Sequence, residues 1–286
     1  MCIIFINLIK ITINNILINI NLLFYLFYIL MKIFIIPYRN RENQKNLFLQ
    51  KIVEIIKVKK WNIENIKILF IHQCDKRLFN RGAMKNIGFL TVKNMFPNKY
   101  KNITLIFHDV DTYPSTPDLL PYETKENIVS HYYGYKFALG GIFAIKGIDF
   151  EKTLGFPNFW GWGFEDNCFY ERCLSSNLEI DRTIFFDIKD KRIERPFDGF
   201  NRVISKREIN IYKKEDPDTI HDIKNLNYNI DTVKFGDSNL VYNIINVNTF
   251  NVKRVIEKNE FMNYDIRKGN KIIIPSGYFR RNWSMF

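Results

Sequence analysis

The stretch Ile103-Thr-Leu-Ile-Phe-His-Asp-Val-Asp111 decides the fold of this 286-residue chain. Its apolar half, Ile103–Phe107, predicts a buried strand that runs directly into an acidic turn. Upstream, two more apolar strands alternate with two segments of helical periodicity, at residues 33–36, 47–56, 66–71 and 84–92. This alternation of strands and helices predicts an α/β fold that begins with a nucleotide-binding βαβαβ unit.

Asp109 and Asp111 follow the strand, at the edge of the sheet where α/β folds bind their ligands. On an extended chain the two side chains would leave one face about 7 Å apart, close enough for one or both to hold a hard cation. Such a cation would bridge to a diphosphate. The alternative is a plain aspartate turn at a strand end. A second Asp-x-Asp, Asp216-Pro-Asp218, is interpreted as a solvated turn.

The run Gly155-Phe-Pro-Asn-Phe-Trp-Gly-Trp-Gly-Phe-Glu-Asp166 places two tryptophans and three glycines directly against two carboxylates. Tryptophan faces stack on sugar rings, glycines allow a close approach, and a carboxylate can take a proton from a hydroxyl. The run therefore predicts a sugar site at the start of a helix expected from about Glu165 to Leu174. Asp166 is the predicted general base, with Glu165 beside it, and helix capping is the alternative role for this pair.

The rest of the chain divides by composition. We expect a loop-rich segment from Pro114 to Tyr135 and a further strand at Gly140–Ile145. A catalytic domain is expected over residues 31–205 and a C-terminal extension over residues 206–286, where apolar and polar residues alternate after Thr232 and predict strands.

The first 30 residues carry one ionic side chain, Lys10, and a dense apolar segment at Leu22–Leu30. They fit a membrane anchor, which would make this a single-pass type II membrane protein of the Golgi kind. Five asparagines argue against that reading, because each buried amide costs on the order of 1 kcal/mol in lipid. In the alternative reading, Met31 is the true start, residues 1–30 are a non-native leader, and the protein is cytoplasmic. A signal peptide is less favoured, because no small-residue cleavage site is visible.

The formal charge of +12 favours anionic partners, although a general excess of Lys, Asn and Ile in the chain explains part of it equally well. No basic run with interleaved aromatic residues is present, so no nucleic acid partner is expected. The four cysteines, Cys2, Cys74, Cys168 and Cys173, show neither metal-ligand spacing nor a disulfide framework. Reduced thiols and a cytosolic type of compartment are the simplest interpretation.

Six motifs occur together in a fixed order: Pro37-Tyr-Arg-Asn-Arg41, Phe79-Asn-Arg81, Asn86-Ile-Gly-Phe89, His108-Asp-Val-Asp111, Gly140-Gly141 and Phe159-Trp-Gly-Trp-Gly-Phe-Glu-Asp166. In this order they resemble the β-1,4-galactosyltransferases, glycosyltransferase family 7, over about residues 33 to 203. His108 and Phe169-Tyr-Glu-Arg172 are most similar to the branch that adds galactose to xylose on proteoglycan cores. The resemblance implies a GT-A fold, a Rossmann-like mixed sheet flanked by helices, here with a strand-rich C-terminal extension.

The resemblance also implies roles for individual residues. The UDP-sugar donor would be bound by Pro37, Tyr38, Arg39, Arg41, Phe79, Arg81, Asp109, Val110, Asp111, Ala138 and Gly141. Arginines suit this role because they pair with phosphate oxygens. The acceptor sugar would contact Trp162, Gly163, Asn167, Phe200 and Val203. A manganese ion on Asp111 would stabilise the departing UDP while Asp166 deprotonates the acceptor hydroxyl.

Three positions depart from the family pattern. No histidine follows the tryptophan motif at the family's metal-binding position, and alignment from Phe200-Asn-Arg-Val203 places Asp187 there. A carboxylate is a good manganese ligand, and a plain surface aspartate is the alternative. Asn167 stands where the family has an acceptor-binding aspartate, so acceptor choice is expected to differ. Ala138 replaces a tyrosine, which predicts room for an N-acetylated donor such as UDP-GalNAc.

The sequence thus predicts a metal-dependent, inverting glycosyltransferase. It would move galactose, or a related hexose such as GalNAc, from a UDP-sugar to a hydroxyl of a glycan or glycoprotein acceptor of the xylose or GlcNAc type. Two alternatives are kept: another GT-A transferase of GalNAc type, and a catalytically inactive relative that binds sugar or UDP.

Overall fold

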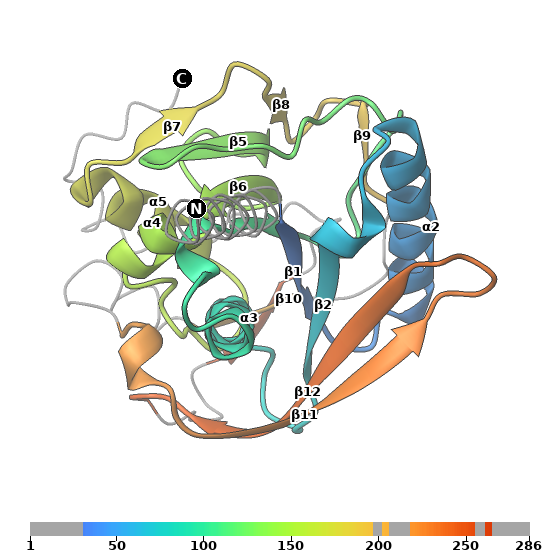
Figure 1. Ribbon diagram of the computed structural model, residues 1–286. Helices are drawn as coiled ribbons and strands as arrows, with labels where there is room; N and C mark the ends of the chain where they lie inside the picture. Colours follow the sequence, from blue (N-terminus) through green and yellow to red (C-terminus); the bar gives the residue numbers. More distant parts are fainter. Residues whose placement is uncertain (1–30, 197–201, 206–217, 255–260, 265–286) are drawn as a thin grey trace, which may run out of the picture.

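The computed structural model describes residues 31–196, 202–205, 218–254 and 261–264. Its framework is a mixed sheet with the strand order β11-β12-β2-β1-β3-β6-β5-β7, and β8 pairs with β5. Figure 1 shows this sheet with helices on both of its faces. The mixed sheet flanked by helices confirms the predicted fold class.

The centre of the sheet is parallel. Strand β1 (Lys32–Tyr38) pairs with β2 (Ile66–Gln73) on one side and with β3 (Thr104–His108) on the other. Every residue of β1 is buried, as expected for a parallel strand covered on both faces. Because the three strands are parallel, their carboxyl ends meet at one edge of the sheet, where the acidic turn leaves β3.

The sheet becomes antiparallel beyond β3. Strand β6 (Ile142–Lys146) is antiparallel to β3, and β5 (Ile128–Gly134) is antiparallel to β6. The short strands β7 (Glu179–Asp181) and β8 (Phe186–Asp187) run parallel to β5. The expectation of a loop over residues 114–135 is wrong at β5, whose aromatic and β-branched side chains are buried in the sheet.

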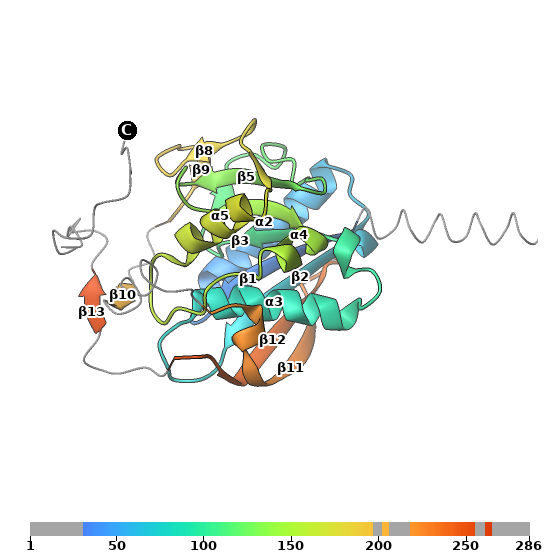
Figure 2. The ribbon, with the colours of Figure 1, turned by 90° about the vertical axis from the view of Figure 1, so that its left-hand side faces the viewer.

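The C-terminal part of the chain extends the other edge of the same sheet. Strand β12 (Val241–Asn251) is parallel to β2, and β11 (Lys224–Lys234) is antiparallel to β12. The strand-rich character expected after Thr232 is therefore confirmed for the part of this region that the structure describes. The described residues also form two separate two-stranded pairs, β4 (Tyr113–Pro114) with β9 (Ile193–Glu194), and β10 (Arg202–Ser205) with β13 (Phe261–Tyr264). Figure 2 shows β10 and β13 to one side of the main sheet.

Helices cover both faces of the sheet. Helix α2 (Glu42–Val58) lies on one face, and α3 (Arg81–Met95), α4 (Gly147–Lys152) and α5 (Glu165–Ser175) lie on the other (Figure 1). Short 3-10 turns occupy the connections, at Ile63–Asn65, Tyr100–Asn102 and Ile220–Asp222. The apolar stripe of α2 is buried as its periodicity predicts, through Phe48, Leu49, Ile52, Ile55 and Ile56.

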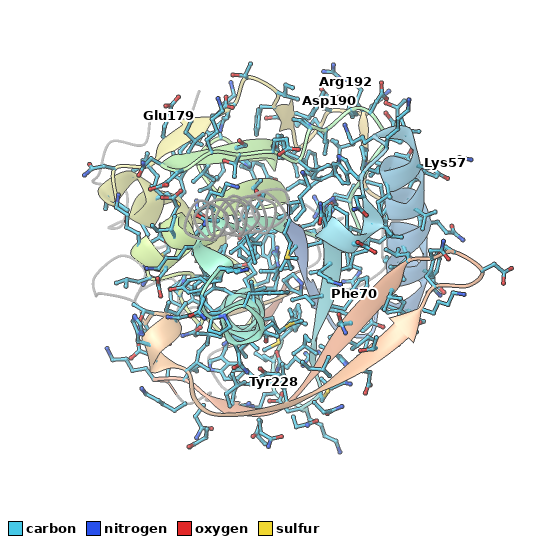
Figure 3. All side chains as sticks on the ribbon, in the orientation of Figure 1. Lys57, Phe70, Glu179, Asp190, Arg192 and Tyr228 are labelled. Carbon is cyan, nitrogen blue, oxygen red and sulfur yellow. The ribbon has the colours of Figure 1, made fainter. Side chains whose placement is uncertain are left out.

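Two apolar clusters lie between the sheet and its helices and are formed by side chains of both. The cluster under α3, α4 and α5 contains a pile of phenylalanines, in which Phe156 stacks on Phe169 with ring centres 4.0 Å apart. The cluster under α2 includes Phe70, which lies inside the molecule in Figure 3, whereas Lys57, Asp190 and Arg192 lie at its periphery. These stacked aromatic rings fix the position of α5 relative to the sheet.

Two expectations concern the whole chain: a membrane anchor and reduced cysteines. Over the described ranges, no helix is both long enough and apolar enough to cross a membrane, and residues 1–30 lie outside those ranges. Cys74 and Cys173 carry free thiols, as expected from the cysteine pattern.

Candidate active site

The acidic turn after β3 directs its two aspartates to different partners. Thr112 donates its N–H to the carbonyl of Asp109 at 3.4 Å, which folds the chain into a turn directly after the strand. Asp109 pairs with Arg81 at 2.7 Å, whereas Asp111 faces Arg41 at 4.0 Å. The expected extended geometry, with both side chains on one face, is wrong, because this turn replaces the strand.

The predicted donor-binding residues of β1 and its following loop lie next to this turn. Pro37 and Tyr38 end β1, and the Tyr38 hydroxyl donates to Glu42 at 2.7 Å. The guanidinium of Arg39 lies 5.3 Å from the centre of the Phe79 ring, so two predicted donor residues from distant motifs are in contact. A cavity of about 390 Å³ adjoins Arg39 and is lined by Arg39, Asn40 and residues 72–76.

Arg81 joins the predicted donor and acceptor regions. It is the first residue of α3, which begins earlier than its periodicity predicts because the side chain of Asn80 caps it. Its guanidinium contacts Asp109 at 2.7 Å, Glu165 at 3.2 Å and Asp166 at 3.9 Å. Burial would lower the pKa of Arg81, but the charges of the three carboxylates outweigh burial and raise it.

Glu165 and Asp166 open α5 but differ in exposure. The Glu165 side chain is 3% exposed, and its carboxylate pairs with Arg81 and accepts the N–H of Gly163 at 3.1 Å. Burial, and then the charge of Asp166, raise the pKa of Glu165. The Asp166 side chain is 19% exposed and can be reached from outside. The more exposed Asp166 can therefore contact a substrate, whereas the buried Glu165 can only contact the protein around it.

A buried lysine outside the set of predicted site residues lies against Asp166. The Lys85 ammonium is 2.5 Å from Asp166 Oδ1. Lys85 follows Arg81 by one helical turn, so both cations project from one side of α3, and this four-residue spacing is the signal that could have revealed it. Burial would raise the pKa of Asp109, but the charges of Arg81 and Lys85 hold that pKa below its ordinary value.

The loop before β6 connects the two acidic motifs. The Gly141 carbonyl accepts the N–H of Asp109 at 3.0 Å, and the N–H of Leu139 donates to the Asp166 carbonyl at 3.0 Å. Gly141 has a φ of +69°, and a Cβ there would meet a backbone carbonyl of β5, so only glycine fits. Gly140 lies directly against the Asp166 carboxylate. The predicted pair of glycines is therefore a structural part of the site.

The two tryptophans of the motif have different environments. Trp160 is buried and stacks on Phe250 of β12, with ring centres 5.5 Å apart, so it belongs to the core. Trp162 is half-buried, which leaves part of its ring able to contact a sugar. Between them, Gly161 donates its N–H to the Phe79 carbonyl at 3.2 Å and ties the tryptophan motif to the donor region.

The backbone entering α5 is strained. Gly161 and Gly163 have φ values of +89° and +117°, and Phe164, the residue before the helix, has a φ of +67°. A bulky side chain rarely adopts this conformation, and such strain is typical of functional sites. The sharp turn brings Glu165 and Asp166 directly behind the tryptophan motif.

The other predicted acceptor-side residues are Asn167, Val203 and Phe200. The Asn167 amide donates to the Phe137 carbonyl at 3.2 Å and so faces the loop before β6. Val203 lies in β10, opposite Asn263 of β13. Phe200 lies outside the described residues.

The metal-binding prediction rests on Asp111 and Asp187. Asp187 is an exposed residue of β8 whose carboxylate accepts the N–H of Lys189 at 3.2 Å. Across the residues that the structure describes, no three His, Cys, Asp or Glu side chains form a ligand group. Oxygen donors of this type fit manganese when diphosphate oxygens of a substrate complete the coordination. Each of the two aspartates therefore offers an oxygen donor of the kind that suits a metal shared with the substrate.

One expectation about a second acidic motif is wrong. Asp218 is buried, and its carboxylate accepts the backbone N–H of Asn158 at 3.0 Å and the side-chain amide at 3.2 Å. It therefore holds the start of the tryptophan motif and is not a solvated turn, because the burial of Asn158 requires a hydrogen-bonding partner.

The mixed sheet, the acidic turn at its edge and the tryptophan motif at the start of α5 define a GT-A-type glycosyltransferase fold. The chain belongs to glycosyltransferase family 7. Residues 30–123 match the N-terminal region of glycosyl transferase group 7, and residues 123–195 match the N-terminal domain of galactosyltransferase. The family resemblance stated from the motifs is therefore confirmed.

Curated relatives include the xylosylprotein 4-beta-galactosyltransferase of Caenorhabditis elegans, which is 29% identical over 160 residues, or 52% of this chain and 52% of that protein. Human beta-1,4-galactosyltransferase 7 is 29% identical over 156 residues, or 52% of this chain and 45% of that protein. The chain thus spans about half the length of the curated relatives it matches.

Two solved structures show the same fold. One is the catalytic domain of Drosophila beta-1,4-galactosyltransferase 7 in complex with xylobiose, with a TM-score of 0.58, 21% identity, and coverage of 76% of this chain and 93% of that one. The other is a mutant of the Drosophila enzyme in complex with manganese, UDP-Gal and xylobiose, with a TM-score of 0.60, 20% identity, and coverage of 76% and 94%.

Proposed function

We propose that this protein is a metal-dependent, inverting galactosyltransferase that moves galactose from UDP-galactose to a hydroxyl of a xylose-type acceptor. Membership of family 7 supports the reaction class. The xylosylprotein relative and the Drosophila complex with manganese, UDP-Gal and xylobiose support the donor, the metal and the acceptor type.

One observation carries the proposal. Arg81 contacts Asp109 on the donor side and Asp166 on the acceptor side, at 2.7 Å and 3.9 Å. A single guanidinium therefore holds the proposed diphosphate region next to the proposed base. Direct transfer requires this closeness, because the acceptor oxygen must reach the anomeric carbon of the bound donor.

Asp166 is the proposed general base. The acceptor hydroxyl transfers its proton to Asp166 while its oxygen forms a bond to the anomeric carbon from the side opposite UDP. The bond between that carbon and UDP breaks, and UDP leaves with the electron pair. This single displacement inverts the configuration at the anomeric carbon. Glu165 is too buried to contact the acceptor, so we assign it to holding Arg81 and the Gly163 backbone.

Three arginines are proposed to bind the diphosphate: Arg39, Arg41 and Arg81. Asp111 is the proposed metal ligand, with Asp187 as a second candidate. Bound there, manganese would neutralise charge on the departing UDP. Trp162 is proposed to stack on the acceptor ring, with Asn167 offering an amide to its hydroxyls.

The test is an array of UDP-sugars against xylose-type and GlcNAc-type acceptors, with and without manganese. We expect UDP release that requires both the acceptor and manganese, a β-linked product, and loss of at least about a hundredfold in kcat for Asp166→Asn. Absence of acceptor-dependent UDP release from every pair, or full activity of the Asp166→Asn variant, would overturn the proposal.

A second function, UDP-sugar binding without transfer, is favoured by one observation. Where the family carries a metal-binding histidine after the tryptophan motif, this chain has Asp187, so the proposed metal ligands are two carboxylates, Asp111 and Asp187. Calorimetry with UDP and manganese measures binding, and an assay of UDP release from UDP-galactose measures turnover. An inactive relative would bind UDP in the presence of manganese but would release no UDP from UDP-galactose.

The cellular location is proposed to follow from residues 1–30. As an anchor they would give a type II membrane protein, and with Met31 as the start the protein would be cytoplasmic. Membrane fractionation of the full chain against a chain beginning at Met31 decides between the two.

A further inference from the structure

Lys85 is a buried charge that the proposed reaction does not use. Its side chain, in the second turn of α3, is only 2% exposed. A lysine is almost never buried unless it is paired, because its ammonium loses hydration there. Its partner and position therefore need a specific reason.

The ammonium lies between an aromatic ring and one carboxylate. It is 4.2 Å from the centre of the Phe156 ring and 2.5 Å from Asp166 Oδ1. Phe156 is fully buried and stacks on Phe169 of α5, so this support is fixed by the core. Lys85 and Asp166 come from different helices, and the core sets the distance between them.

The two oxygens of Asp166 have different neighbours. Oδ1 is held by Lys85, whereas Oδ2 lies against Gly140 and 3.9 Å from Arg81. Rotation of the carboxylate would break the contact with Lys85 and leave a buried ammonium unpaired. Lys85 therefore selects one orientation of the carboxylate.

We propose that Lys85 is a positioning residue for the general base. Its ammonium holds Oδ1 of Asp166 and so presents Oδ2 to the acceptor hydroxyl, whose proton still goes to Asp166. The inference rests on the proposed function, because it requires Asp166 to be the base. A purely structural role, compensation of charge in the folded protein, would instead change stability and donor binding together.

The experiment compares Lys85→Met with Lys93→Met in the full chain, using UDP-galactose, manganese and a xyloside acceptor. Lys93 is a matched control: it lies on the same helix and pairs with Glu151 at 2.6 Å, but its side chain is 42% exposed and lies outside the site. We expect Lys85→Met to lower kcat about 30-fold with the donor KM within about twofold, and Lys93→Met to change neither. Lys85→Arg, which keeps the charge, is expected to retain kcat within about fivefold.

Asp166→Asn separates the two hypotheses. If Asp166→Asn transfers galactose at the wild-type rate, the proposed function falls. If Asp166→Asn is inactive while Lys85→Met keeps kcat within about twofold, only the positioning role falls. A Lys85→Met variant whose donor KM rises as much as its kcat falls also overturns it. If Lys85→Met does not fold, Lys85→Arg decides: a folded Arg variant that loses more than about tenfold in kcat contradicts the proposal.

Discussion

The carboxylate of Asp166 lies directly against the Cα atom of Gly140, so a Cβ on residue 140 would overlap its Oδ2 atom. Gly140 does not have a left-handed backbone, so the requirement for glycine comes from the carboxylate and not from φ. The loop before β6 therefore leaves no room for a side chain at position 140 beside the proposed base.

Gly140→Ala is expected to displace the Asp166 carboxylate and lower kcat by about 10- to 100-fold, because small misplacements of a reacting group are costly. The overlap should also destabilise the fold by about 1 to 3 kcal/mol. Gly236→Ala is the control: it has a φ of +51° and nothing within 4 Å, so it costs stability through strain alone and should leave kcat unchanged. Steady-state kinetics and thermal unfolding measure both effects, and wild-type kcat in Gly140→Ala contradicts the fit.

The two tryptophans should separate stability from acceptor binding. Trp160→Ala removes a buried ring from its stack on Phe250 and should destabilise the protein by about 3 to 5 kcal/mol. Trp162→Ala should leave unfolding nearly unchanged and raise the acceptor KM by about tenfold or more, because the half-exposed ring is the proposed stacking surface. Equal effects of the two variants on unfolding would contradict the assignment.

Asp187→Ala tests the second metal ligand. We expect the manganese concentration for half-maximal activity to rise about tenfold, and a larger rise for Asp111→Ala. Asp190→Ala is a suitable control, because Asp190 is a nearby aspartate whose carboxylate pairs with Arg192 at 2.7 Å. Unchanged manganese activation in Asp187→Ala would leave Asp187 a plain surface residue.

Ala138 tests donor choice. Its small buried side chain in the loop before β6 is expected to leave room for an acetamido group, so hydrolysis of UDP-GalNAc should be within about tenfold of that of UDP-galactose. Ala138→Tyr should suppress the GalNAc reaction selectively. Strict preference of the wild-type protein for galactose would refute this expectation.

His108 should make the fold sensitive to acid. Burial lowers the pKa of His108 to about 4, from an ordinary value of 6.5. Since the unfolded chain takes up the proton first, the stability contributed by neutral His108 is complete above about pH 6.5 and is lost as the pH falls toward 4. At pH 5 the loss is about 2 kcal/mol. Urea unfolding of the wild type and of His108→Gln at pH 7 and pH 5 measures this effect. The free energy of unfolding should change less between the two pH values in the variant than in the wild type. An equal change in both proteins would contradict the prediction.

Local patterns predicted most of the framework, because the strands β1, β2 and β3 and the helix α2 are apolar at the spacing of their own secondary structure. Strand β5 was missed because its histidine and tyrosines do not look like a buried strand until β6 and β7 pair with it. In the site, the order of the motifs predicted Arg81, Asp111 and Asp166 as site residues. It could not show that Lys85 reaches Asp166, or that Asp218 is buried, because both contacts join segments far apart in the chain.

The C-terminal strand β12 has a practical consequence for work on this protein. The family match ends at residue 195, yet β12 continues the sheet beside β2, and its Phe250 supports Trp160. A fragment trimmed to the matched region would leave β2 as an unprotected sheet edge, inviting aggregation, and would remove the backing of the tryptophan motif. Recombinant forms of the protein, and chimaeras made with relatives, should therefore keep the chain through Asn251.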